Sequence, residues 1–217
     1  MIKEYFNTFW AKYHQLRGVK MLHRNQMSKA YKHLEKSLIY KDYTETYFYF
    51  AIALIGQEKH KSAIPYLQKI LDKHPDERIA LSSLAECYLV TRQWDKSEDI
   101  LSYLKQKSPN NATIQKLYKI CIDPVLREKY VQGKELFYSA SDELDKKNYD
   151  IAYEKCLKAI ELEDDNPAYY YLAGLILMSA KKPKAEIEPF CEKAVNLAPK
   201  NLAYKQQLQF LKTKYKK

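Results

Sequence analysis

The chain has 217 residues, which is enough for one or two domains with a sizeable core. Hydrophobic residues at 46% and charged residues at 29% fit a globular protein rather than a disordered one. Only 4 glycines and 8 prolines occur, which argues against strands joined by tight turns. No apolar run approaches the ~20 residues of a membrane span, and no signal peptide is visible, so we expect a cytoplasmic protein.

The formal net charge of +10 is concentrated at the two ends of the chain. Residues 1–43 carry 9 basic and 3 acidic side chains, and residues 200–217 carry 6 lysines and no acidic side chain. Residues 44–199 are close to neutral, with 22 basic and 24 acidic side chains. Basic ends favour an anionic partner such as lipid head groups, nucleic acid or an acidic protein. Solvation of two exposed end helices explains the same pattern, and both interpretations stay open.

A repeated pattern of two helices begins at about residue 11. The first helix of a unit carries a bulky residue followed, three and four places later, by a large and a small residue, as in Tyr47, Phe50 and Ala51. The small residue allows the two helices of the unit to approach closely. Units begin at spacings of 33, 34, 34, 21, 34 and 35 residues near Ala11, Thr44, Arg78, Ala112, Gly133, Pro167 and Leu202. Three units close with a proline, which cannot continue a helix: Pro75, Pro109 and Pro199.

With its period of 34 residues, this pattern resembles the tetratricopeptide repeat family from about residue 11 to the end of the chain. The resemblance implies an all-α fold, a right-handed superhelical solenoid of antiparallel helix pairs. Two arrays are predicted, because the unit at Ala112 has only its first helix and Asp123-Pro124 starts a new one. The first array is residues 1–122 (units 11–43, 44–77 and 78–111, half unit 112–122), and the second is residues 123–217 (units 133–166 and 167–201, terminal helix 202–217). One continuous superhelix with an irregular unit stays open as the alternative.

The sequence shows no motif that is typical of catalysis or metal binding. The sequence holds no GxSxG, HExxH or phosphate-binding glycine loop, so we expect no enzyme activity, no catalytic residue, no cofactor and no metal site. The five histidines are expected to face solvent: His14, His23, His33, His60 and His74. The four cysteines form no CxxC pair and recur at shared repeat positions, so they are expected to be small core residues: Cys87, Cys121, Cys156 and Cys191.

The resemblance implies that the first helices line a concave groove at the second, fifth, sixth, ninth and twelfth places of each unit. The candidate partner-binding residues at these places are Phe48, Tyr49, Ile52, Ile55, Ile79, Glu86, Leu89, Phe137, Tyr171, Leu175 and Met178. Residues 47–55 and 169–178 are apolar nearly all round, which favours an apolar groove for an amphipathic helix or an extended peptide. Burial of these helices between neighbouring repeats explains their apolar character as well, and both interpretations stay open. One subfamily clamps a chaperone's terminal carboxylate with Lys and Asn, but those places hold Gln15, Val19, Tyr49, Ile79 and Ser83, so no such clamp is expected.

Residues 2–20 carry an apolar stripe at helical spacing, with basic residues around it. The stripe consists of Ile2, Phe6, Phe9, Trp10, Tyr13 and Leu16. Aromatic and basic residues together are typical of a helix at a membrane interface, whereas the alternative is the first helix of the first unit packing on residues 30–39. The predicted function is a non-enzymatic scaffold that binds a peptide or helix of another protein. The alternative is a peripheral membrane adaptor that uses its basic terminal helices on an anionic membrane; nucleic acid is not an expected partner.

Overall fold

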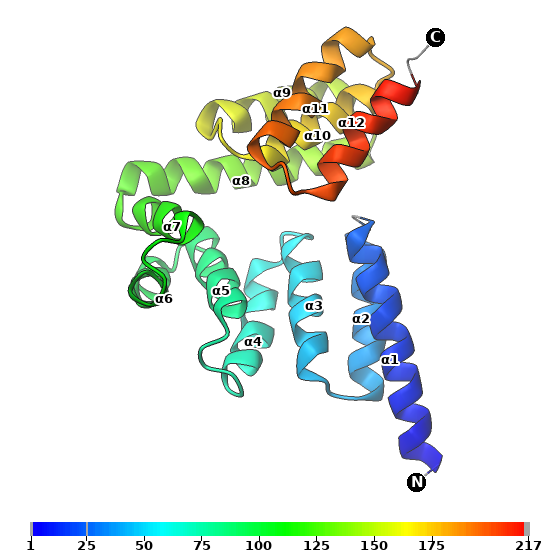
Figure 1. Cartoon of the computed structure of the whole chain (residues 1–217), viewed down its shortest axis with the longest axis vertical. Coiled ribbons are helices and arrows are strands. Elements are labelled where there is room, and N and C mark those ends of the chain that lie inside the picture. Colours follow the sequence, from blue (N-terminus) through cyan, green and yellow to red (C-terminus); the bar gives the residue numbers. More distant parts are fainter. Residues whose placement is uncertain (1, 25, 215–217) are drawn as a thin grey trace. The chain divides into compact units, whose positions relative to one another are not determined.

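The computed structural model describes residues 2–24 and 26–214 and folds them into twelve α-helices, with no strand in those two ranges (Figure 1). The helices are α1 (Ile2–His23), α2 (Met27–Tyr40), α3 (Thr44–Ile55), α4 (His60–Leu71), α5 (Arg78–Val90), α6 (Trp94–Lys107), α7 (Ala112–Ile122), α8 (Pro124–Asp145), α9 (Tyr149–Leu162), α10 (Pro167–Ser179), α11 (Lys184–Leu197) and α12 (Leu202–Lys214). Successive helices pack as hairpins, with α1 on α2, α3 on α4, α5 on α6 and α10 on α11. The all-α solenoid of helix pairs predicted from the sequence is therefore confirmed.

The chain divides into two compact units, Met1–Pro124 and Val125–Lys217, called the N-terminal and the C-terminal unit below. Helices α1 to α7 belong to the N-terminal unit. As predicted, α7 is not followed by a short second helix: a helix of 22 residues, α8, begins instead at Pro124. The array limits at residues 122 and 123 stay a prediction.

Small residues set the distance between helices in the N-terminal unit. A Cβ atom on Gly18 of α1 would lie 2.5 Å from Cγ of Leu34 on α2, which is fully buried. Ala51 of α3 and Ala63 of α4 are fully buried in the same core cluster as Leu34. Because interiors are close-packed, larger side chains at these positions would force the helices apart.

The C-terminal unit follows the same rule around α10. Tyr169 at the start of this helix is its largest fully buried side chain, and its ring lies 5.3 Å from the ring of Phe137 on α8. A Cβ atom on Gly174 would lie 3.0 Å from Sγ of Cys191 on α11. The small residue of the repeat pattern therefore again lies where a second helix approaches the first.

The turn between the two helices of a unit adopts the same backbone conformation four times. Glu58, Arg92, Lys147 and Lys181 have φ angles of 63°, 62°, 66° and 58°, in the left-handed region. After each of them, the next backbone N–H donates to the carbonyl five residues earlier at 2.8 to 3.0 Å, the pattern of a Schellman helix end. A left-handed conformation costs a non-glycine residue roughly 1 kcal/mol, which the helix-end hydrogen bonds and the packing of the second helix offset.

Candidate partner-binding site

Helix α3 carries aromatic residues at four consecutive positions, 47 to 50, and these face two environments. They cannot all face the core, because successive side chains point around the helix with 3.6 residues per turn. Tyr47 and Phe50 are 5% and 3% exposed and belong to the core of the N-terminal unit. Phe48 and Tyr49 are only partly buried, and their ring centroids lie 5.8 Å apart. The two rings therefore form aromatic surface on a well-packed helix.

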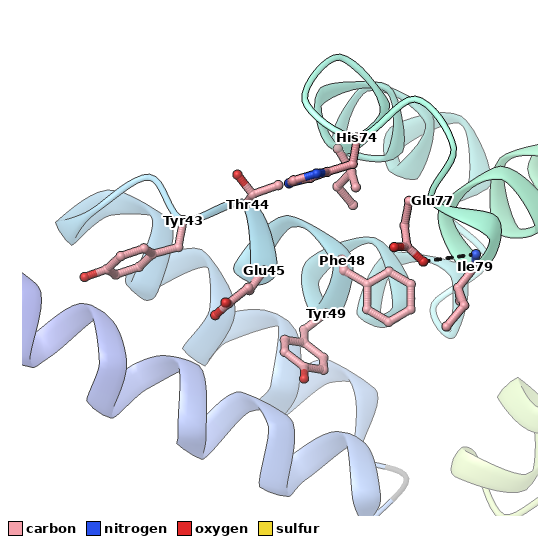
Figure 2. A pocket seen from close by; sticks show the side chains of 9 residues that line it. Tyr43, Thr44, Glu45, Phe48, Tyr49, His74, Glu77 and Ile79 are labelled. Carbon is pink, nitrogen blue, oxygen red and sulfur yellow. Dashed lines mark hydrogen bonds between the residues drawn. The ribbon is translucent and has the colours of Figure 1, made fainter.

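A pocket of about 490 Å³ opens beside these two rings (Figure 2). Its lining consists of Tyr43, Thr44, Glu45, Phe48, Tyr49, Ile70, His74, Glu77 and Ile79. Ile79, in the first turn of α5, is 61% exposed. Oε1 of Glu77, the N-cap of α5, accepts a hydrogen bond from the Ile79 backbone N–H at 3.4 Å. The cap thus helps to hold the start of α5, and with it Ile79, at the pocket.

The pocket lining is acidic and lies in the part of the chain that is close to neutral. Its lining includes the carboxylates of Glu45 and Glu77 and the imidazole of His74, but no lysine or arginine. Lys73 is nearby at the rim, where its Nζ donates to the Thr44 hydroxyl at 3.0 Å. The pocket therefore combines apolar contact area with negative charge.

Three of the predicted partner-binding residues meet in this pocket, namely Phe48, Tyr49 and Ile79. Ile52 and Ile55 follow on α3 and are partly buried, and Ile55 packs against the core of the unit. Glu86 on α5 is partly exposed outside the pocket. Leu89 is fully buried, so its side chain contributes to the core rather than to a surface.

The predicted groove residues of the C-terminal unit lie in a different setting. The ring of Tyr171 lies 5.0 Å from the ring of Tyr204 on α12, and Nε2 of Gln207, also on α12, donates to the Tyr171 carbonyl at 3.0 Å. The last helix of the unit therefore covers part of this face. The other three predicted residues are partly buried: Phe137, Leu175 and Met178.

Six residues line the pocket but are missing from the predicted set, namely Tyr43, Thr44, Glu45, Ile70, His74 and Glu77. Most of them lie at helix ends or in the turn after α4, whereas the repeat pattern describes only the faces of first helices. No pattern in the sequence marks turn residues as part of a binding surface. They enter the site only because α4 and α5 are connected beside α3.

A second candidate surface lies on α1, which has two opposite apolar faces. One face packs on α2 through Ala11 and Gly18, and the Ser37 hydroxyl of α2 donates to the Ala11 carbonyl at 2.8 Å. The other face, called the α1 stripe below, is between 37% and 84% exposed and consists of Tyr5, Phe6, Phe9, Tyr13 and Leu16. The predicted alternative, packing of this first helix on residues 30–39, is thus confirmed for the helix, while these five side chains stay exposed. Of the predicted stripe, Trp10 stacks on Tyr40 of α2 at 6.4 Å, and the side chain of Ile2 lies outside the described part.

The described residues offer little for catalysis or metal binding. No three His, Cys, Asp or Glu side chains among them are placed to hold a metal ion. All four cysteines are buried, as predicted, and none of them is in a disulfide. Burial raises the pKa of Cys87 and Cys156 to about 12 and that of Cys191 to about 11. These thiols are therefore protonated, and poorly nucleophilic, at neutral pH.

The prediction that the histidines face solvent is wrong for His14 and His60, which are 9% and 4% exposed. Nδ1 of His14 lies 3.0 Å from Nδ1 of His33, and the His14 ring stacks on Tyr40 at 5.9 Å. Nδ1 of His60 lies 3.1 Å from the Glu58 carbonyl oxygen in the preceding turn. The α1–α2 hairpin brings two histidines that are 19 residues apart into contact, which spacing along the chain did not reveal.

We expect this histidine pair to make the N-terminal unit less stable in acid. Burial, and then the charges of His33 and Lys36, lower the pKa of His14; burial, and then Arg17 and Lys36, lower the pKa of His33. Below the ordinary pKa of 6.5 the unfolded chain therefore binds protons that the folded unit does not, so stability falls as pH falls through the lowered values. Urea unfolding followed by circular dichroism between pH 7.5 and 5 measures the loss. His33→Asn should flatten the dependence, and an unchanged pH profile would contradict the assignment.

Stacked helix hairpins with a pocket between first helices define a helical-repeat scaffold, a class of protein that offers extended surface to other proteins. Residues 54–120 match the family model described as tetratricopeptide repeat. The tetratricopeptide repeats predicted from the 34-residue period are therefore confirmed over this part of the chain. A fold of such repeats supports a protein–protein interaction scaffold and is typical of proteins without enzyme activity.

No curated protein matches the chain. Among similar solved structures is the complex of the TPR2AB domain of yeast Sti1 with pHSP90, at 14% identity and a TM-score of 0.42, over 95% of this chain and 84% of that one. MamA from Desulfovibrio magneticus RS-1 is 16% identical with a TM-score of 0.48, and the match covers 92% of this chain and 95% of that one. YrrB, a tetratricopeptide repeat protein with an unusual peptide-binding site, is 13% identical with a TM-score of 0.46, and the match covers 90% of each chain. At TM-scores below 0.5 the ligands of these proteins do not transfer to this chain.

Proposed function

We propose that the N-terminal unit binds a segment of another protein in the pocket beside Phe48 and Tyr49. The observation that carries this proposal is a pocket of about 490 Å³ whose lining joins the exposed Ile79 to two partly buried aromatic rings. Apolar surface of this kind gains free energy when a partner covers it, at roughly 25 cal/mol per Å². An amphipathic helix or an extended peptide supplies side chains at suitable intervals for such a pocket.

Site-specific photocrosslinking tests the location. A benzophenone amino acid in place of Tyr49 should capture a partner, whereas the same group in place of Lys61, exposed on α4 and outside the pocket, should not. Mass spectrometry of the crosslinked product then identifies the partner and the segment that touches position 49. Equal capture at both positions would contradict the proposal.

Affinity for that identified segment gives a quantitative prediction. Phe48→Ala should weaken binding by about 2 kcal/mol, or roughly 30-fold, because aromatic anchors in desolvated pockets dominate binding energy. Ile151→Ala, an exposed apolar residue on α9 of the C-terminal unit, is the matched control and should leave affinity unchanged. Isothermal titration calorimetry measures both. Binding that survives Phe48→Ala would exclude this pocket as the site.

A second candidate function, peripheral membrane association, is favoured by the α1 stripe. The stripe is flanked by the exposed basic residues Lys12, Arg17 and Lys20, and aromatic rings beside basic side chains suit the head-group region of a bilayer. The C-terminal end is less suited, because Lys212 lies 3.6 Å from Glu192. Lys216 and Lys217 of that end lie outside the described residues. None of the described helices is both long and apolar enough to cross a membrane.

Vesicle flotation tests this second function. The chain should float with vesicles containing phosphatidylserine at low ionic strength and dissociate at high salt, because each basic residue near the surface contributes about 1 kcal/mol. Phe9→Glu with Leu16→Glu should abolish flotation. A matched pair of glutamates at Ile39 and Ile151, exposed apolar residues outside α1, should not. Flotation that changes neither with salt nor with the α1 substitutions would contradict α1 as the membrane-binding helix.

A further inference from the structure

We infer that the pocket selects a partner segment with an arginine or lysine side chain next to an apolar one. This inference rests on the proposed function and assigns the chemistry of the occupant. Its starting point is the contrast between a chain with 37 lysines and arginines and a pocket lined by none of them. The lining holds two carboxylates, Glu45 and Glu77, and one imidazole, His74, and the lysine at the rim, Lys73, is bonded to the Thr44 hydroxyl.

The two carboxylates have hydrogen-bonding capacity to spare. Glu45, exposed in the first turn of α3, makes no side-chain hydrogen bond or ion pair with any described residue. Glu77 uses Oε1 for the long bond of 3.4 Å to the Ile79 N–H, which leaves Oε2 for a ligand. Figure 2 shows both carboxylates on the rim around Phe48 and Tyr49. A cation at this rim would gain charge-assisted hydrogen bonds that the chain does not itself supply.

The aromatic rings add to the attraction for a cation. Most tyrosine rings of the N-terminal unit already lie under a basic side chain of the same chain, such as Tyr47 under Lys69 at 4.8 Å and Tyr118 under Lys105 at 4.1 Å. Among the described residues, no basic side chain lies over the ring of Phe48 or Tyr49. An arginine or lysine of a partner can therefore stack there, and an arginine also matches a carboxylate with two parallel hydrogen bonds.

The apolar part of the pocket fixes what stands beside the cation. Ile79 and Phe48 both line the pocket, and Ile79 is 61% exposed, so together they offer contact area to an aliphatic or aromatic side chain. An acidic or phosphorylated segment would meet two carboxylates and lose affinity, and a nucleic acid backbone is disfavoured for the same reason. The occupant is thus a protein segment that pairs a basic and an apolar side chain.

Selection from a random peptide library displayed on phage tests this chemistry with the full-length chain as bait. Peptides enriched on the chain should carry arginine or lysine next to leucine, isoleucine or an aromatic residue. A synthetic peptide from that set should bind at least about tenfold more weakly to Glu45→Gln/Glu77→Gln, and its affinity should fall as salt rises. Glu98→Gln, exposed on α6 away from the pocket, is the control and should bind normally.

The outcomes separate this inference from the function on which it rests. Enriched peptides whose binding is lost in Phe48→Ala but kept in the double glutamine variant would overturn the charge inference alone. Neutral or acidic consensus peptides would overturn it as well. Enriched peptides indifferent to Phe48→Ala, or no enrichment at all, would overturn the pocket as a binding site and the inference with it.

Discussion

Replacing Ala85 by arginine is expected to lower the free energy of unfolding of the N-terminal unit by more than about 3 kcal/mol. Ala85 is fully buried on α5, and its carbonyl accepts a hydrogen bond from the Ser97 hydroxyl of α6 at 2.9 Å. An arginine there would force α5 and α6 apart and would bury a charge without a partner. The repeat register predicted from the sequence places a small residue at this position.

Both tryptophans, Trp10 and Trp94, lie in the N-terminal unit, so urea unfolding followed by tryptophan fluorescence reports on that unit. The matched control is Ser83→Arg, two residues earlier on the same helix and partly exposed. The control should unfold within about 1 kcal/mol of the parent protein. Similar unfolding midpoints for the Ala85 and Ser83 variants would contradict the proposed packing of α5 on α6.

The second large effect is expected for Phe50→Ala, at about 3 to 5 kcal/mol of lost stability. The Phe50 ring is 3% exposed and lies 4.8 Å from Tyr66 and 5.0 Å from Tyr31. Phe48, two residues earlier, lines the pocket and is only partly buried, so Phe48→Ala should cost clearly less. The same fluorescence experiment compares the two. Equal losses would show that Phe48 belongs to the core and would remove the aromatic wall of the proposed site.

The repeat, the helix pairing and the positions of small residues could be predicted because each depends on spacing along the chain. Ala85 and Gly174 occur at one place in a 34-residue period, and a small side chain there has a single packing explanation. The start of a new helix at Pro124 was predictable because proline favours the first turn of a helix.

The site was only partly predictable, because a helix face does not distinguish surface from core in a solenoid. Phe48 and Leu89 occupy equally suitable groove places, yet one lines the pocket and the other is fully buried. Glu77 and His74 reach the pocket from a turn whose path depends on how α4 and α5 pack. The contact between His14 and His33 likewise depends on a hairpin and not on any sequence motif.

The four left-handed turns have a consequence for how the repeat is encoded. Glu58 and Arg92 are 34 residues apart, and so are Lys147 and Lys181, although none of these residues is the glycine that such a conformation favours. The distance from Arg92 to Lys147 is 55 residues, so one interval alone absorbs the missing helix. The repeat spacing is thus kept by segment length and backbone geometry, although the residue at this position differs between units. Glycine at any one of the four positions would relieve local strain, so the stability of each helix pair can be changed separately at its own turn.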